Sequence, residues 1–302
     1  MKVYSKIDQI PAGSASNIVT PGAIILEGGA FRGVYTSGVL DCLMENDINF
    51  QTTVGASAGC LNGFNYVAGA IGRAARTNLR FRHDSRWIGL KAFRQSGSFT
   101  GFHFLYNELK ELEPFDESRA LDPQKRFVCT ATNCDTGKQE YLEGKTLEEI
   151  ELNMSASSSM QLMSKMVWIN GTPYLDGCCS RKIALPWVLD QGYENVIVVR
   201  TRNREFRTGE RVWKILEKPF YHKRKELLAS LAQVEPDYNK MCDDMVELEK
   251  QGRIFVIAPK EPITIGSMEG DMEKLGDLYW TGYHEMEEQL DALKKYITRN
   301  EK

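Results

Sequence analysis

The sequence has few of the residues that build metal sites and disulfide frameworks. It contains only four histidines, with no close spacing between them, so a histidine-rich metal site is not expected. Its seven cysteines are scattered, their number is odd, and no C-x-x-C pair occurs, a pattern that favours reduced thiols. We therefore expect a protein that works without a metal or another cofactor.

Long apolar runs and a strong excess of one charge are also absent. No apolar stretch is long enough to span a bilayer, and residues 1–20 lack the apolar core of a signal peptide, so we expect a cytoplasmic protein. With a formal net charge of -3, the chain gives no sign of nucleic-acid binding. Its 302 residues, 42% of them hydrophobic, suffice for one large α/β domain or two small ones.

A serine pentapeptide is the first motif that indicates chemistry. Residues 55–59 read Gly-Ala-Ser-Ala-Gly, a G-x-S-x-G sequence that follows a short apolar run and opens a helical pattern. Strand, sharp turn and helix are the context of a nucleophile elbow, in which flanking glycines avoid a clash of Cβ atoms. The context predicts Ser57 as a nucleophile, which needs a base and an oxyanion hole from elsewhere in the chain.

A glycine-rich loop lies one strand earlier. Residues 22–27 form a buried-strand pattern, residues 28–33 read Gly-Gly-Ala-Phe-Arg-Gly, and a helix follows to about Asn46. Free amides at a helix start suit an anion. A dinucleotide pyrophosphate is disfavoured because Ala30 breaks G-x-G-x-x-G and no acidic residue ends a second strand. The alternative anion is the oxyanion of an acyl-transfer intermediate.

A third motif ends a predicted hairpin. Residues 167–175 alternate around an Asn-Gly turn and lead into Asp176 and Gly177. The aspartate stands at a strand end, and the glycine frees the backbone to turn away. Taken alone, an Asp-Gly pair is most often an ordinary turn.

In this order, the three motifs resemble those of the patatin-like phospholipase family, serine acyl hydrolases that use a Ser-Asp dyad. The resemblance spans about residues 20–200, where the family reads G-G-G-x-[RK]-G, G-x-S-x-G and D-G-[GA]. It implies a three-layer α/β/α sandwich with a mainly parallel central sheet, Ser57 as nucleophile and Asp176 as base. It also implies an oxyanion hole built from the amides of Gly28, Gly29 and Ala30.

At the other positions of the family motifs, this sequence partly matches the family pattern and partly departs from it. Arg32 falls on the basic position of the glycine loop, where it steadies the loop or meets an anionic headgroup. Ala30 replaces the third glycine but keeps an amide, and Cys178 replaces the last Gly or Ala of the third motif. Gln161 stands where the family often has a proline. We expect one domain over residues 1–302, with the core at about 20–200 and the rest packed on it.

Hydrophobic periodicity predicts the other elements. The expected elements are strands around a turn in 126–141, a short helix at 147–152, a small-residue segment at 153–159, a helix at 183–191, a strand at 195–200, a helix at 227–250, a strand at 254–258 and a final helix at 275–297. The small residues indicate that the backbone passes close to another part of the protein.

Two segments have both a structural and a functional interpretation. Residues 69–94 are basic and predict a helix with a solvated face, while the aromatic residues of 93–106 predict a loop packed on the core or a lid over an apolar acyl site. Residues 200–225 hold ten Lys or Arg with Trp213 and Phe220 among them. This stretch predicts a solvated helical face or a patch for anionic headgroups at a membrane surface.

Three functions fit these motifs. The first is hydrolysis of lipid esters, as in a phospholipase A or lysophospholipase, through Ser57 and Asp176. The second is an α/β-hydrolase triad in which His222 or His284 joins them, although neither histidine follows a late strand. The third is a lipid-binding or regulatory protein that keeps the fold without turnover. The sequence does not choose among phospholipid, lysophospholipid, neutral glyceride and short ester, and it leaves the oligomeric state open.

Overall fold

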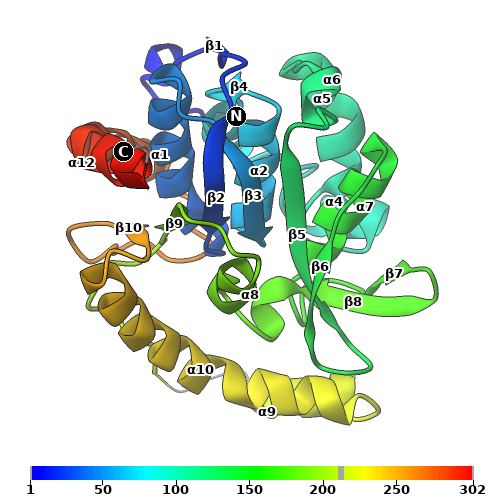
Figure 1. Cartoon of the computed structure of the whole chain (residues 1–302). Helices are drawn as coiled ribbons and strands as arrows, with labels where there is room; N and C mark the ends of the chain where they lie inside the picture. The colour runs from blue at the N-terminus through cyan, green and yellow to red at the C-terminus, as the bar shows by residue number, and fades with distance from the viewer. Residues whose placement is uncertain (1, 210–213, 301–302) are drawn as a thin grey trace.

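The computed structural model describes residues 2–209 and 214–300, and its centre is a mixed β-sheet (Figure 1). Within the described residues the sheet has eight strands in the order β10-β9-β2-β3-β5-β8-β7, with β6 paired to β5. The parallel strands are β2 (Thr20–Leu26), β3 (Phe50–Ala56), β5 (Arg126–Asn133), β9 (Val196–Val199) and β10 (Phe255–Ile257). The antiparallel strands are β6 (Gln139–Leu142), β7 (Val167–Ile169) and β8 (Thr172–Asp176).

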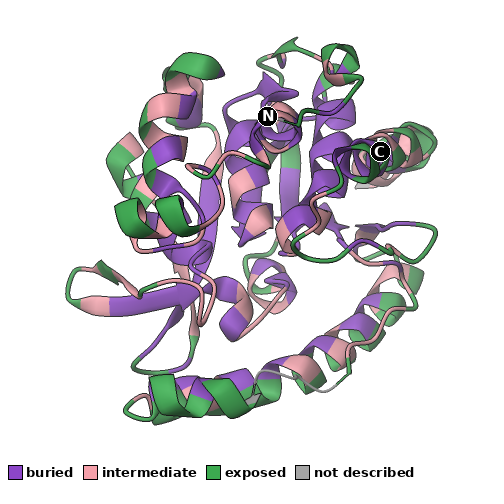
Figure 2. Cartoon of the chain, turned by 180° about the vertical axis from the view of Figure 1, so that it is seen from behind, coloured by how far each residue is buried: buried purple, intermediate pink, exposed green. Residues whose placement is uncertain are grey.

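Helices cover both faces of the sheet, as the side chains of β2 illustrate. Ile24 and Leu26 pack on one face with α1 (Val34–Glu45) and α11 (Met272–Glu287). Ala23 and Ile25 pack on the other with α8 (Leu185–Asp190) and α10 (Lys225–Lys250). Strands buried on both faces read as continuous apolar runs, and the parallel strands of the sheet are almost wholly buried in Figure 2. The predicted three-layer α/β/α fold with a mainly parallel sheet is confirmed.

The site-bearing helices lie on the α1 side of the sheet. There α2 (Ala58–Val67) and α7 (Leu147–Ser157) pack on β5. The remaining helical elements are α3 (Arg73–Phe81), α4 (Leu90–Ser96), α5 (Leu109–Leu112), α6 (Glu117–Ala120), α9 (Lys214–Tyr221), α12 (Leu290–Ile297) and the short turns η1 (Ile7–Gln9), η2 (Ala30–Gly33), η3 (Phe104–Glu108), η4 (Gly177–Cys179) and η5 (Thr298–Asn300). Strands β1 (Gly13–Ser14) and β4 (Ala70–Ile71) form a separate pair.

The C-terminal helices pack directly against the N-terminal ones. A Cβ on Gly38 of α1 would lie 2.1 Å from the carbonyl oxygen of Tyr279 in α11, so the two helix backbones nearly touch. The Tyr279 hydroxyl also donates to the buried carboxylate of Asp41 at 2.9 Å. These contacts agree with a C-terminal part packed on the core, while the single domain over the whole chain stays a prediction. Among the described residues, no helix is long and apolar enough to cross a membrane.

Two predictions about helices are wrong. The helix predicted at 275–297 is two helices, because the chain turns at residues 288–289 and the Gln289 amide bonds back to the carbonyl of Met286. The basic face of α3 is not merely solvated. Arg76 and Arg80 both bond to the buried carboxylate of Glu113 at 2.8 Å, an arrangement that lysine and arginine counts alone do not reveal.

Candidate active site

Ser57 occupies the sharp turn between β3 and α2. Its backbone has φ 54° and ψ -124°, a conformation that L-residues rarely adopt, and its side chain is buried. A Cβ on Gly55 would lie 2.5 Å from the backbone of Cys60, and one on Gly59 would lie 2.3 Å from the carbonyl oxygen of Leu26. Both flanking positions therefore require glycine, and the tight turn places the serine at the carboxyl end of β3, where open α/β sheets bind ligands.

Asp176 reaches the same point from the end of β8. It is 2% exposed, and its Oδ1 accepts a hydrogen bond from the Cys178 amide at 2.8 Å. Burial raises the pKa of Asp176 to about 6, against the lowering effect of hydrogen bonds from the Ser57 hydroxyl and the Cys178 amide. The structure thus brings together two residues that are 119 positions apart in the chain. Gly177 is needed for this turn because a Cβ there would lie 2.3 Å from Thr130 Oγ1.

The small-residue segment 153–159 turns out to hold both residues in place. The Ser57 amide donates to the carbonyl oxygen of Ser157 at 3.1 Å, and the Ser158 hydroxyl donates to the carbonyl oxygen of Ser57 at 3.2 Å. The Asp176 amide donates to the carbonyl oxygen of Ser159 at 2.9 Å. These serines were not predicted as site residues. The sequence signal was the run of small residues at the end of α7, which indicated close backbone contact without indicating its partner.

The glycine loop lies against this pair. A Cβ on Gly28 would lie 3.0 Å from Ser57 Cβ and 2.5 Å from Cys178 Sγ, so the loop touches both motifs. Ala30 has φ 49°, the left-handed region that a glycine would occupy without strain. Within the described ranges, no hydrogen bond is donated by the amides of Gly28, Gly29 or Ala30. These amides lie at the start of η2 or just before it, ahead of α1, and such free donors suit a developing negative charge.

Arg32 faces away from the serine. Phe31 and Gly33 line the pocket beside Ser57, whereas Arg32 does not. Burial, together with the nearby positive charge of Arg202, lowers the pKa of Arg32 to about 10. Its buried Nε finds no acceptor among the described residues. The structure therefore puts Arg32 behind the loop, and its contact with a headgroup stays a prediction.

An apolar pocket opens from Ser57 and runs along α2. It encloses about 940 Å³, part of it open to solvent. Ser57 and Asn65 both line it, and their separation along α2 corresponds to about 12 Å. The walls are mainly apolar and include Leu61, Phe64, Ile88, Leu105, Leu109, Phe115, Met154 and Met160. The lining also includes polar groups, namely the buried Arg73 and the ion pair of Lys110 with Glu151 at 2.7 Å.

The predicted aromatic segment 93–106 contributes one wall of this pocket. Thr100, Leu105 and Tyr106 line it directly. Phe102 stacks on Tyr106 with ring centroids 6.0 Å apart, which holds the segment together behind the lining. The segment is thus packed on the core, and its movement as a lid stays a prediction.

Histidine takes no part in the contacts of the site. His222 Nδ1 lies 3.0 Å from the carbonyl oxygen of Pro219, and His284 Nδ1 lies 3.3 Å from a carboxylate oxygen of Glu287. Both rings are exposed, and neither bonds to Ser57 or Asp176 in the part of the chain that the structure describes. In the same residues, no group of three His, Cys, Asp or Glu is placed to hold a metal ion.

Comparisons with known proteins match two parts of the chain to two different family models. A family model described as "Patatin-like phospholipase" matches residues 24–185, and one described as "Domain of unknown function (DUF6363)" matches residues 224–298. "Uncharacterized protein YjjU" of Escherichia coli (strain K12) is 24% identical over 246 residues, 80% of this chain and 69% of the relative. The structure of VipD from Legionella pneumophila aligns with a TM-score of 0.48 at 13% identity, covering 93% of this chain and 68% of VipD.

Proposed function

Because the chain belongs to the patatin-like phospholipase family, we propose that it hydrolyses carboxyl esters of lipids with Ser57 as nucleophile and Asp176 as base. The observation that carries the proposal is that the buried Asp176 carboxyl lies close enough to the Ser57 hydroxyl for their interaction to lower the pKa of Asp176. No histidine lies between them in the described residues, which favours a dyad over a triad. Membership of the family supports ester hydrolysis as the class of reaction. The positions of Ser57 and Asp176 support their roles as nucleophile and base.

The chemistry follows from the environment of each group. A serine hydroxyl is a poor nucleophile until a base takes its proton, and Asp176, with a pKa of about 6, is a stronger base than an ordinary aspartate yet still ionised at neutral pH. As Ser57 attacks the ester carbonyl, its proton moves to Asp176, which then protonates the departing alcohol. A water molecule gives a proton to Asp176 as its oxygen attacks the acyl-enzyme, the bond from the acyl group to Ser57 breaks, and Asp176 returns the proton to the Ser57 oxygen. The amides of Gly29 and Ala30 stabilise the oxyanion in both steps.

The apolar pocket gives the substrate class. An acyl chain attached to Ser57 has an apolar channel along α2, whereas a short polar ester would leave that surface uncovered. We therefore place the acyl chain in the pocket and the alcohol or headgroup on the solvent side. This assignment fits a phospholipase A or lysophospholipase and leaves the headgroup to an assay with a lipid panel.

Site-directed variants test the dyad. Ester hydrolysis by Ser57→Ala and Asp176→Asn should fall at least about a hundredfold, and a fluorophosphonate should label Ser57 in the wild type only. His222→Ala and His284→Ala serve as controls and should keep full activity. A wild type that is never labelled would support a lipid-binding protein without turnover. Loss of activity in either histidine variant would support the triad.

We also propose that one exposed face contacts a membrane from the cytoplasmic side. The α9 face comprises exposed apolar residues, Ile215 (84% exposed), Leu216 (47%) and Phe220 (71%), and the exposed cations Lys218, Lys223 and Lys225. Apolar side chains flanked by lysines suit an anionic lipid surface. In Figure 1 the α9–α10 arm lies on the side to which the arrowheads of β2 and β3 point.

The α9 face includes only part of the basic segment that the sequence predicted at 200–225. Several cations of that segment are paired with acids: Arg204 with Glu249, Arg207 with Asp243 and Arg224 with Asp135. Arg211 and Trp213 lie outside the described residues. Among the described residues of this segment, the exposed apolar and basic side chains without an acidic partner are therefore those of the α9 face.

Cosedimentation with vesicles tests this contact. Phe220→Asp should reduce binding to vesicles of phosphatidylcholine with phosphatidylglycerol about tenfold, because an exposed anchor is lost and a negative charge is added. Ile18→Asp changes an apolar residue that is 55% exposed in the segment between β1 and β2, and it should bind like the wild type. Figure 1 shows β1 at the opposite end of the molecule from α9 and α10. Equal binding by Phe220→Asp, or binding that ignores the lipid charge, would refute the contact.

A further inference from the structure

A buried carboxylate stands directly before the glycine loop. Glu27 is 2% exposed, and a charge so far from water needs hydrogen-bond donors. It has two: the Thr201 amide donates to Oε2 at 2.7 Å, and the Tyr238 hydroxyl donates to Oε1 at 2.5 Å. Both donors lie outside the segment that carries the three motifs. The residue before the loop is therefore fixed by the later part of the chain.

Thr201 contacts the loop itself as well. Its Oγ1 donates to the carbonyl oxygen of Gly28 at 3.2 Å. It also fills the space beside Gly29, where a Cβ would lie 2.5 Å from Oγ1. One threonine at the end of β9 thus binds Glu27 through its amide and orients the Gly28 peptide through its hydroxyl.

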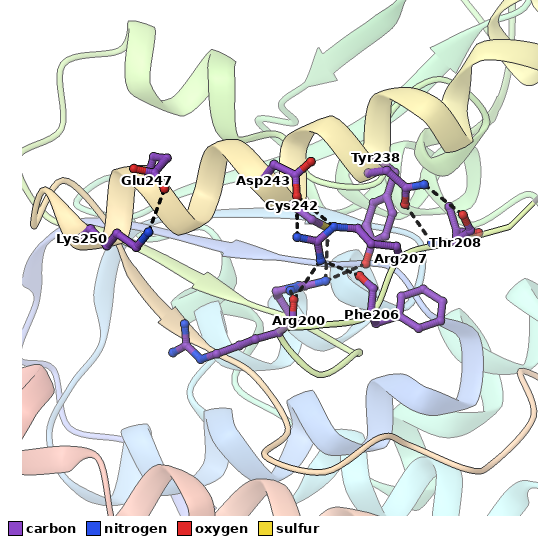
Figure 3. A network of polar contacts seen from close by, with 11 residues as sticks. Arg200, Phe206, Arg207, Thr208, Tyr238, Cys242, Asp243, Glu247 and Lys250 are labelled. Atoms are coloured by element: carbon purple, nitrogen blue, oxygen red, sulfur yellow. Dashed lines mark hydrogen bonds and ion pairs between the residues drawn. The ribbon is translucent and has the colours of Figure 1, made fainter.

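Tyr238 brings the C-terminal helix α10 into the same network. The Arg200 guanidinium donates from Nη2 to the Tyr238 hydroxyl at 3.2 Å and to Cys242 Sγ at 3.2 Å, as Figure 3 shows. A guanidinium only donates hydrogen bonds. The Tyr238 oxygen therefore accepts from Arg200, which directs its own proton to Glu27. Arg200 and Tyr238 are 2% and 3% exposed, so no water competes for these bonds.

We propose that Glu27, Thr201 and Tyr238 form a brace that sets the position of the oxyanion-binding amides. The inference rests on the proposed function, because it takes Gly29 and Ala30 as the donors to the oxyanion. The three brace residues are positioning residues that do not touch substrate. The C-terminal region that matches a domain of unknown function thereby gains a role, since its Tyr238 fixes the active-site loop.

The brace matters because oxyanion donors act over a narrow range of distance. They must lie about 2.7–3.1 Å from the charged oxygen, and a misplacement of about 1 Å can lower the rate about a hundredfold. Most of the acyl pocket is formed by other elements, including α2, α3, α5 and α7, and the loop contributes only Ala30, Phe31 and Gly33. Substrate binding before the reaction therefore depends little on the brace. A weakened brace is therefore expected to lower kcat and leave KM nearly unchanged.

Three variants and one control test this expectation with an ester that the wild type hydrolyses. Tyr238→Phe and Thr201→Val each remove one hydroxyl with little change of shape, and each should lower kcat about tenfold or more with KM within twofold. Thr201→Ser keeps the hydroxyl and should restore kcat to nearly the wild-type value. Tyr296→Phe is the control, because that hydroxyl bonds to Val196 at the other end of β9 and should leave kcat unchanged.

Hydrogen exchange of the peptide that spans residues 27–33 gives a second readout that needs no turnover. Exchange should quicken in Tyr238→Phe and Thr201→Val and stay at the wild-type rate in Tyr296→Phe and Thr201→Ser. A wild type without Ser57-dependent hydrolysis would contradict the proposed function, and the exchange data would still test the brace. Unchanged exchange or unchanged kcat in both hydroxyl-deleted variants would overturn the brace, as would an equal loss in Tyr296→Phe.

Discussion

Replacing Asp176 by asparagine should make the protein more stable while it abolishes hydrolysis. The pKa of the buried carboxyl is raised from 3.8 to about 6, so the folded protein holds a proton there more tightly than the unfolded chain does. When the pKa of an acid is higher in the folded state than in the unfolded chain, the free energy of unfolding falls as pH rises from the unfolded-state pKa to the folded-state pKa. Above the folded-state pKa the whole of this loss of stability is present. Asparagine cannot ionise and escapes this loss. Its side-chain oxygen can still accept the hydrogen bond from the Cys178 amide.

The magnitude follows from the shift. Because the two pKa values differ by about two units, ionisation of Asp176 lowers the unfolding free energy of the wild type by about 3 kcal/mol at pH 8. At pH 4.5 the same ionisation lowers it by about 1 kcal/mol. In a chain of this size 1 kcal/mol moves Tm by about 2 °C, so Asp176→Asn should melt about 6 °C above the wild type at pH 8. At pH 4.5 the advantage should shrink to about 2 °C.

Thermal unfolding of both proteins across this pH range provides the assay. Asp41 also has a raised pKa, about 7, because it is buried in α1, and its titration changes the stability of both proteins alike. The difference between the two curves therefore isolates Asp176. A constant difference at all pH values would refute the reasoning, since the carboxyl would then not titrate differently in the folded state. A variant less stable than the wild type at pH 8 would do the same.

Other changes have equally defined outcomes. The kcat/KM of the wild type should rise with pH around 6, as Asp176 ionises to act as base, and a flat profile from pH 4.5 to 8 would contradict that role. Ala30→Gly should raise the unfolding free energy in urea by about 0.5–1 kcal/mol, because glycine relieves a φ of 49°. Gly59→Ala should lower Tm and hydrolysis together, because its Cβ would meet the Leu26 carbonyl, with a loss of about 2 kcal/mol or more. Glu113→Gln should destabilise by about 3 kcal/mol in the same titration, because two arginines of α3 lose their buried counter-charge.

The sequence was informative wherever the structure depends on local pattern. The apolar runs predicted the core strands β2, β3 and β9, since strands buried on both faces have no polar alternation. The Asn170-Gly171 pair predicted its hairpin turn, and both residues have positive φ, 49° and 80°. The motif order predicted that Ser57 and Asp176 meet, and they do.

Partners that are distant in the chain could not be predicted in this way. Glu27 and Tyr238 are 211 positions apart, and neither residue type nor spacing indicates that they bond. The serines of α7 left only a compositional signal, because backbone-to-backbone contacts such as that of Ser57 with Ser157 can be made by any residue small enough to approach. The arginines of α3 looked like a solvated face because their common acceptor, Glu113, follows more than thirty residues later.

The contact between α1 and α11 has a consequence for biosynthesis. The hydrogen bond from Tyr279 to Asp41 joins positions 238 residues apart, so at ordinary translation speeds the first helix waits roughly 10–50 s for the last large one. During that interval the face of α1 that α11 will cover, which includes Tyr35 and Gly38, remains open to other chains on the ribosome. Completion of this fold therefore waits until α11 has left the ribosome, and the nascent chain is expected to need protection by a chaperone until then.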